Sequence, residues 1–248
     1  MADTRWRIDL EYDGAPFAGW QLQPNARTIQ GEVEAALRAL LGHPARVSAA
    51  GRTDAGVHAA LQVATFVSSA PRAPRSIRDG LNAHLPPEIA CTQALVVPDH
   101  FDPRRTPHVK VYRYAWLVRV PRSPLRRHRA WHVRTPLDLT AMQQAVACLV
   151  GTHDFSSFRA SGCSARHPNR TLEGASVQAA GDELHLRLVG TGFLRHMVRI
   201  VAGSLYDVGR GHRRVEWIAE LLAARDRGLA GKTAPPHGLL LEQITYRA

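Results

Sequence analysis

Apolar positions in the first half of the chain recur with the periods of short strands and helices. From Trp6 to Tyr12 every second side chain is apolar, which is typical of a half-buried strand, and Asp13-Gly14 ends the run. Thr28 is a favourable N-cap residue for a helix whose apolar positions have helical spacing and which ends at Gly42. Four further elements are predicted: strands over 46–50, 61–67 and 89–97, and a helix over 76–85. The predicted order is β-α-β-β-α-β.

The second half of the chain repeats this order with one additional helix. An alternating run over 110–118 predicts a strand, and a helical pattern over 139–150 ends at Gly151. The Gly181-Asp182 pair joins two further alternating runs and predicts a hairpin. The remaining predicted elements are helices over 193–208 and 215–224 and a last strand over 238–246.

This repetition predicts an α+β protein built from two ferredoxin-like, or RRM-like, lobes. Each lobe is expected to have an antiparallel sheet with its helices on one face. The polar residues 100–108 form the predicted linker, which gives an N-terminal lobe over 1–104 and a C-terminal lobe over 105–248. Two similar lobes also predict an active-site cleft between them.

Composition is that of an ordinary globular protein, with 45% apolar and 21% charged residues. No apolar run approaches the roughly 18 residues that a membrane span needs, so no membrane association is expected. The first residues carry charges where a signal peptide would be apolar. The three cysteines are far apart and form no CxxC pair, which indicates a reduced, cytoplasmic protein without a disulfide or zinc framework.

Charge is distributed unevenly along the chain. The formal net charge is +11, but residues 1–104 carry 10 arginines against 11 acidic residues, a net of −1. Residues 105–248 carry 22 basic against 10 acidic residues, a net of +12. Such a basic half predicts a polyanionic partner, and nucleic acid is the commonest one.

Two motif-like signals are weak, and a third stays open. Gly231 to Thr233 read GKT, but Asp226 stands where a phosphate loop needs its first glycine, so the match is attributed to chance. His128 and His132 have the spacing of metal ligands on a helix but no third ligand nearby, and no metal is expected. The arginine-rich loop over 120–132 could bind phosphates, with Trp131 stacking on a base, or it could be a solvated loop that Trp131 anchors.

Arg195 and Arg199 lie one turn apart in an otherwise apolar predicted helix. A charge on a largely buried helix needs a partner, because an unpaired buried ion is costly. That partner is either a structural acid or a functional carboxylate.

The stretch GRTDAGVHA places two charges, Arg52 and Asp54, between Gly51 and Gly56. A structural interpretation is that Thr53 or Asp54 caps a helix or closes an Asx turn. A functional one is that the glycines let the backbone approach a ligand closely and leave Asp54 in a cleft. An ionised carboxylate beside an arginine suits a nucleophile or base rather than a general acid.

The same stretch resembles the signature of pseudouridine synthases, and of the tRNA pseudouridine synthase A family in particular. Further segments resemble that family in its order: residues 9–37, VYRY at 111–114, GTHDFSSFRASGC at 151–163, GFLRHMVRIVAGSLYDVGRG at 192–211 and PPHGLLLEQITY at 235–246. The resemblance runs from about Arg5 to Tyr246.

The resemblance implies isomerisation of uridine to pseudouridine at positions 38, 39 and 40 of the tRNA anticodon stem-loop, with no cofactor or metal, by a homodimer whose subunits both contact one tRNA. By position, it makes Asp54 the catalytic carboxylate, Arg199 its paired arginine and Tyr112 the tyrosine that contacts the base. Arg52 then lies beside the flipped nucleotide. The resemblance also implies two tRNA-contacting segments: Phe101, Asp102, Pro103, Arg104 and Arg105, and Gly162, Cys163, Ser164, Ala165 and Arg166.

Two other functions are compatible with parts of the sequence. Two RNA-recognition-like lobes without catalysis would make an RNA-binding protein. A hydrolase built on Asp54 would need a second carboxylate within several ångströms, and the sequence offers no obvious one.

Overall fold

The structure is a computed structural model that describes residues 3–69 and 72–247. The chain folds into two compact units, in which the last residues return to the beginning of the chain. The first unit comprises Met1–His108 and Leu241–Ala248, and the second comprises Val109–Leu240. In the described part of the chain, no helix is both long and apolar enough to cross a membrane.

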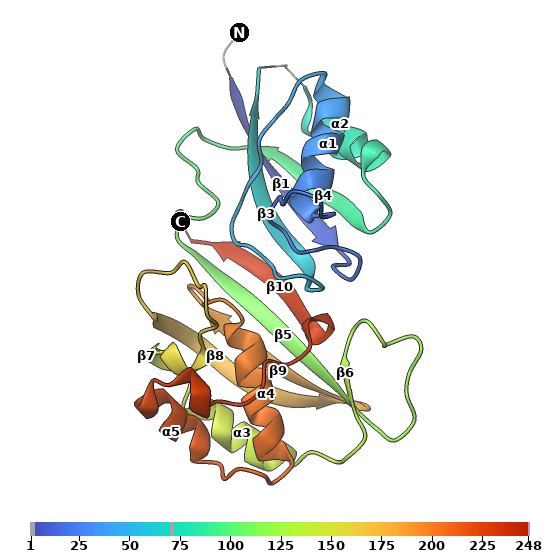
Figure 1. Cartoon of the computed structure of the whole chain (residues 1–248). Helices are drawn as coiled ribbons and strands as arrows, with labels where there is room; N and C mark the ends of the chain where they lie inside the picture. The colour runs from blue at the N-terminus through green and yellow to red at the C-terminus, as the bar shows by residue number, and fades with distance from the viewer. Residues whose placement is uncertain (1–2, 70–71, 248) are drawn as a thin grey trace. The chain divides into compact units, whose positions relative to one another are not determined.

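The first unit is a mainly antiparallel sheet with two helices (Figure 1). Its elements are β1 (Thr4–Tyr12), α1 (Ile29–Leu41), β2 (Ser48–Ala49), β3 (His58–Ser68), α2 (Pro74–His84) and β4 (Ile89–Val96). Strand β1 lies between β3 and β4 and is antiparallel to both, while β2 pairs with β3. The C-terminal strand β10 (Leu239–Tyr246) also lies beside β3.

The core of this unit follows the apolar pattern of the sequence. The alternating side chains of β1, from Trp6 to Tyr12, are at most 2% exposed. Helix α1 begins where expected, because the Thr28 hydroxyl accepts a hydrogen bond from the Gly31 amide. It ends at Gly42, which adopts the left-handed conformation that favours glycine.

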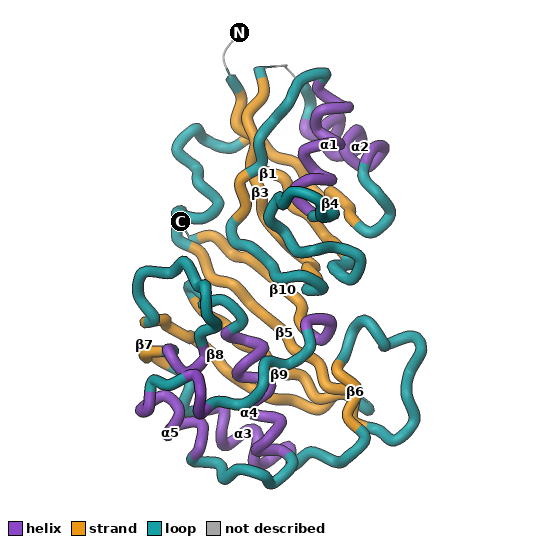
Figure 2. Tube along the Cα trace, in the orientation of Figure 1, coloured by secondary structure: helices purple, strands orange, loops and turns teal. Residues whose placement is uncertain are grey.

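The second unit is again a sheet with helices (Figure 2). Its elements are β5 (His108–Val118), β6 (Trp131–Val133), α3 (Leu139–Ala147), β7 (Gly151–Asp154), β8 (Asn169–Ala180), β9 (Glu183–Gly190), α4 (Met197–Gly209) and α5 (Trp217–Ala224), with short 3₁₀ turns at Ser156–Phe158, Arg227–Leu229 and Pro236–Gly238. Antiparallel pairing gives the order β5-β9-β8-β7, and β6 adds to β5 in parallel. The predicted hairpin turn lies at Gly181, whose φ is +61°.

The predicted α+β class is therefore confirmed, while several details differ. Helix α4 begins at Met197 rather than near Phe193, because His196 adopts a left-handed φ of +60° that no helix interior has. Strands β6 and β7 were not predicted, since three or four residues are too few to show a period. Residues from Leu241 onward join the first unit, whereas the sequence-based division assigned them to the second lobe.

Candidate active site

The stretch around Asp54 is a tight loop between β2 and β3 of the first unit. The Asp54 carbonyl accepts a hydrogen bond from the Val57 amide at 3.1 Å, which closes a four-residue turn. Gly56 is the third residue of that turn and has a φ of +76°, a conformation that side chains disfavour. No helix begins here, so the helix-capping interpretation of Thr53 and Asp54 is wrong.

Residues Tyr12 to Trp20 hold this loop from one side. The Trp20 amide donates to the Thr53 carbonyl at 3.0 Å, and the Gly56 amide donates to the Phe17 carbonyl at 3.3 Å. From β3, the Gln62 amide nitrogen donates to the Gly51 carbonyl at 2.8 Å. The backbone on both sides of Asp54 is thus fixed by hydrogen bonds, as a positioned catalytic side chain requires.

Gly14 and Gly19 allow the segment that contains them to pack closely against the Asp54 loop. A Cβ at Gly14 would lie 2.0 Å from the Val57 carbonyl oxygen, and a Cβ at Gly19 would lie 2.8 Å from the Thr53 carbonyl oxygen. Gly19 also has a φ of +96°. The glycines of the segment DGAPFAGW therefore exist because the loop carrying Asp54 packs directly on their backbone.

Beneath the loop, a buried hydroxyl pair joins it to the sheet. The Tyr12 and Thr53 hydroxyls lie 2.8 Å apart, and the Gln62 amide nitrogen lies 3.5 Å from the Tyr12 hydroxyl. Burial raises the pKa of Tyr12 to about 12, partly offset by these hydrogen bonds. The phenol is therefore neutral at physiological pH and acts as a structural support. The sequence had not singled it out, because it looks like the last core residue of β1.

The two charged side chains of the loop differ in exposure. Asp54 is half-buried, and Arg52 is exposed. The carboxylate is thus neither sealed in the interior nor extended into bulk solvent. A half-buried carboxylate on a fixed backbone is held in place and still accessible to a ligand.

Within the second unit, Tyr112, Phe193 and Arg199 are the residues of interest. Tyr112 on β5 is buried to 9% exposure, and its ring meets that of Phe193 edge-on at a centroid distance of 4.8 Å. Phe193 belongs to the loop before α4, whereas the sequence pattern had placed it in a helix.

Arg199 lies in the first turn of α4, where the helix dipole disfavours a cation. Its Nε donates to the Ala234 carbonyl at 2.8 Å, and the Ala234 amide donates back to the Arg199 carbonyl at 3.0 Å. The Arg199 side chain, which is half-buried, is thus held against the backbone at Ala234 within the second unit. Its predicted pairing with a carboxylate stays a prediction.

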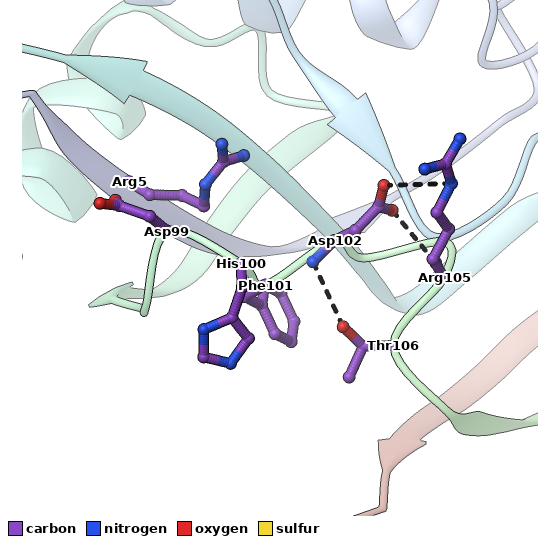
Figure 3. Close-up of a pocket in the computed structure, with 7 residues that line it drawn as sticks. All are labelled: Arg5, Asp99, His100, Phe101, Asp102, Arg105 and Thr106. Atoms are coloured by element: carbon purple, nitrogen blue, oxygen red, sulfur yellow. Dashed lines mark hydrogen bonds and ion pairs between the residues drawn. The ribbon is translucent and has the colours of Figure 1, made fainter.

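The first predicted tRNA-contacting segment, Phe101 to Arg105, borders a pocket of about 440 Å³ in the first unit (Figure 3). Phe101, Asp102 and Arg105 line it together with Arg5 and Thr106. Asp102 organises the turn by accepting from two backbone amides and lying 3.8 Å from the Arg105 guanidinium. Pro103 lies outside this lining, buried, with its carbonyl accepting from the Tyr246 hydroxyl. Arg104 also lies outside it and is exposed.

The second predicted segment, Gly162 to Arg166, is an exposed turn in the second unit. The Arg159 guanidinium donates to the carbonyls of Cys163 and Ala165 at 3.0 and 2.6 Å. Desolvation raises the pKa of the Cys163 thiol, but hydrogen bonds from the Arg195 and Ala165 backbone and the nearby Arg159 outweigh it and lower that pKa. Arg195 also donates to the Ser161 carbonyl, so it supports this turn rather than a buried acid.

The Trp131 ring packs against other side chains of the second unit. Its ring centroid lies 4.5 Å from that of Tyr206, and the Lys232 ammonium lies 4.7 Å from it. These contacts favour the interpretation in which Trp131 anchors the base of the arginine-rich loop over base stacking.

Comparison with known proteins finds matches over most of the segments described above. A family model described as tRNA pseudouridine synthase matches residues 10–104 and 145–247. The chain belongs to the tRNA pseudouridine synthase family. A protein from Myxococcus xanthus named tRNA pseudouridine synthase A is 48% identical over 244 residues, covering 98% of this chain and 92% of that one. Proteins of the same name from Geotalea uraniireducens (strain Rf4) and Ralstonia nicotianae (strain ATCC BAA-1114 / GMI1000) are 45% and 44% identical, covering 97% and 98% of this chain and 98% and 90% of theirs.

Membership of this family confirms the resemblance inferred from the motifs and makes the protein an isomerase that acts on tRNA. It decides against the non-catalytic RNA-binding protein and against the hydrolase. The loop of Arg52 and Asp54 lies within the matched residues, as do Arg199 and the segment Gly162 to Arg166. Tyr112 lies between the two matched ranges.

Proposed function

We propose that the protein converts uridine to pseudouridine at positions 38, 39 and 40 in the anticodon stem-loop of tRNA, with Asp54 as the catalytic carboxylate. Family membership supports the reaction class. The observation that carries the assignment of Asp54 is the loop itself, in which flanking hydrogen bonds and two close-packed glycines fix a half-buried carboxylate. Such fixation is needed where a side chain must meet a reacting atom within a fraction of an ångström.

The reaction is a net isomerisation, which explains why one carboxylate can serve it. The bond from uracil N1 to ribose C1′ breaks, the base turns, C5 joins C1′, and the C5 proton is lost while N1 gains one. An ionised Asp54 can capture the electron-poor C1′, take a ribose proton to assist elimination, or add to the pyrimidine. All three routes need the same anion in the same place.

Three further side chains are assigned roles by the proposal. Arg199 pairs with Asp54 and keeps it anionic and oriented. Tyr112, whose ring Phe193 supports, contacts uracil and assists removal of the C5 proton. Arg52, exposed on the same loop, takes the space of the extruded nucleotide or holds its phosphate.

The proposal also covers how tRNA is held. The net formal charge of +11 lies entirely on the second unit. The first unit carries 12 basic and 12 acidic residues, and the second carries 20 against 9. We therefore assign most phosphate contacts to the second unit and the catalytic loop to the first. The segments Phe101 to Arg105 and Gly162 to Arg166 contact tRNA, and two copies of the chain form the working homodimer.

Replacing Asp54 by Asn tests the central assignment. The amide keeps the shape but lacks the negative charge, so release of tritium from tRNA containing 5-tritiated uridine is expected to fall by at least 1,000-fold. Binding of tRNA is expected to change by less than about threefold, because Asp54 does not contact phosphates. Mapping of the modified nucleotides in the wild-type reaction checks positions 38, 39 and 40.

Asp79→Asn is the matched control, since it removes the same charge from an exposed helix position in the same unit. It should retain full activity. Unchanged tritium release in the Asp54→Asn variant would refute the proposal, and release of free uracil by the wild type would indicate hydrolysis instead.

A further inference from the structure

The arginine-rich loop between β5 and β6 borders a pocket that the proposed catalytic residues do not use. The loop leaves the end of β5 without regular secondary structure (Figure 2). The pocket has a volume of about 360 Å³ and lies within the second unit. Its basic lining consists of Arg122, Arg126, Arg127, His132 and His237. Leu117 and Ala130, both buried, form its apolar part.

The loop has a defined conformation. The Arg119 guanidinium donates to the carbonyls of Pro121 and Arg122 and lies 3.2 Å from the Asp182 carboxylate. At the far end, the amides of Arg129 and Ala130 donate to the Arg126 carbonyl. Pro121 and Pro124 restrict the backbone further. The arginines are thus presented on a held loop, which lowers the entropic cost of binding a ligand.

The positive charge of the pocket is largely uncompensated. Arg126 lies 3.3 Å from Glu183, but the same carboxylate also lies 2.6 Å from His185. Among the described residues, no carboxylate lies within ion-pair distance of Arg122 or Arg127, and both side chains are exposed. His132 is oriented by its Nε2, which donates to the Arg119 carbonyl at 2.9 Å. Arg122 and Arg127 therefore present two guanidinium groups that no carboxylate of the described residues pairs, beside the shared Arg126, and such a group of arginines suits an anion.

The position of the pocket separates it from the reacting nucleotide. Leu117 follows Tyr112 by five residues along β5, which corresponds to about 17 Å at the usual rise per residue. One nucleotide in contact with Tyr112 cannot also fill this pocket. An anion bound there must be another part of the RNA or a separate molecule.

We propose that this pocket binds a backbone phosphodiester of the tRNA, away from the uridine that is isomerised. The inference rests on the proposed function for the identity of the RNA. Planar guanidinium groups match phosphate oxygens in pairs, and exposed arginines reach the backbone without reading bases. The site therefore contributes affinity that is independent of sequence, which suits an enzyme that modifies several positions in different tRNAs.

The test compares the full-length protein with an Arg122→Gln/Arg127→Gln variant in binding to unmodified tRNA at several salt concentrations. Loss of two phosphate contacts should weaken binding about tenfold or more near 0.1 M salt. It should also make the slope of log K against log salt shallower by about one to two. The rate of tritium release at saturating tRNA should stay within twofold, because the reacting groups are untouched.

Arg72→Gln/Arg75→Gln is the matched control, since it removes two exposed arginines from the first unit, whose net charge is zero. The control should leave affinity and slope nearly unchanged. Equal effects of both variants, or an unchanged slope in the pocket variant, would overturn the proposal. Far-UV circular dichroism and the melting temperature confirm that each variant is folded.

Two further binding measurements identify which molecule supplies the anion. Calorimetric titration of the wild type with inorganic phosphate alone should show no saturable binding below about 10 mM, and tight binding that the pocket variant loses would assign the site to free phosphate instead. Loss of binding to phosphatidylserine vesicles with tRNA affinity intact would assign it to a lipid surface. A wild type that binds tRNA but releases no tritium would refute the proposed function, while the comparison of slopes would still decide the pocket.

Discussion

Tyr12 illustrates how a single buried hydroxyl can support a functional loop. Its phenol lies 2.8 Å from the Thr53 hydroxyl, one residue before Asp54, and within 3.5 Å of the Gln62 amide. Thr53 is itself buried, so the Tyr12 and Thr53 hydroxyls depend on each other for a hydrogen bond. Burial raises the pKa of Tyr12 to about 12, because a buried site disfavours the charged phenolate.

Tyr12→Phe should lower the free energy of unfolding by about 1–3 kcal/mol at neutral pH, because Thr53 loses its buried partner. The folded pKa is raised, so the contribution of the hydroxyl is complete below pH 10 and is lost as the pH rises towards 12. The difference between wild type and variant, measured by urea unfolding, should be constant from pH 7 to 9.5 and shrink above pH 10. Parallel curves up to pH 12 would contradict this account.

At the scale of elements, the segment from Asp13 to Trp20 forms the platform on which the Asp54 loop lies. It has no regular secondary structure, yet it supplies the carbonyl of Phe17 and the amides of Gly14 and Trp20 to the loop and to β3. Two segments about 40 residues apart in sequence thus act as one rigid unit. The platform, rather than the loop alone, determines where the carboxylate lies.

Gly14→Ala tests the platform, because its Cβ would lie 2.0 Å from the Val57 carbonyl oxygen and the loop must move. We expect the maximal rate of tritium release to fall at least tenfold, with tRNA affinity nearly unchanged. Gly174→Ala is the control: its Cβ would meet Val189 at 3.6 Å, an ordinary contact, and activity should persist. Full activity in Gly14→Ala, or equal losses in both variants, would contradict the platform.

Elements with a clear hydrophobic period and distinct capping residues were predicted well from the sequence. Helix α1 was predicted with its ends, because Thr28 and Gly42 are chemically distinct caps. The start of α4 was missed because nothing in GFLRH distinguishes a loop from a helix until His196 takes a positive φ. Asp54 stood out as a lone carboxylate between glycines, whereas the support from Gly14, Gly19 and Tyr12 depends on long-range packing that no local pattern reveals.

At the scale of the whole chain, the net charge and the last residues belong to different units. The formal charge of +11 belongs to the second unit, whereas the first unit is balanced and includes the chain's last residues. Tyr246 contacts the first unit at four places: its ring meets those of Phe101 and His108, the Arg7 guanidinium lies 5.2 Å from it, and its hydroxyl donates to the Pro103 carbonyl. The first unit is therefore complete only when the end of the chain has folded onto it.

Deleting residues 241–248 should consequently destabilise the remainder of the first unit, up to His108, which is distant in sequence from the deletion. The deletion removes all of β10 except its first two residues, which exposes the edge of β3 and takes away the ring that packs against Phe101. Hydrogen exchange followed by mass spectrometry should show amides of β3 and of residues 101–106 exchanging at least tenfold faster than in the full chain. The β8–β9 hairpin, which belongs to the second unit, should keep its protection and serves as the internal control. Equally faster amide exchange in both units, or in neither, would contradict this expectation. It would show that β10 does not stabilise the first unit in the way the contacts of Tyr246 indicate.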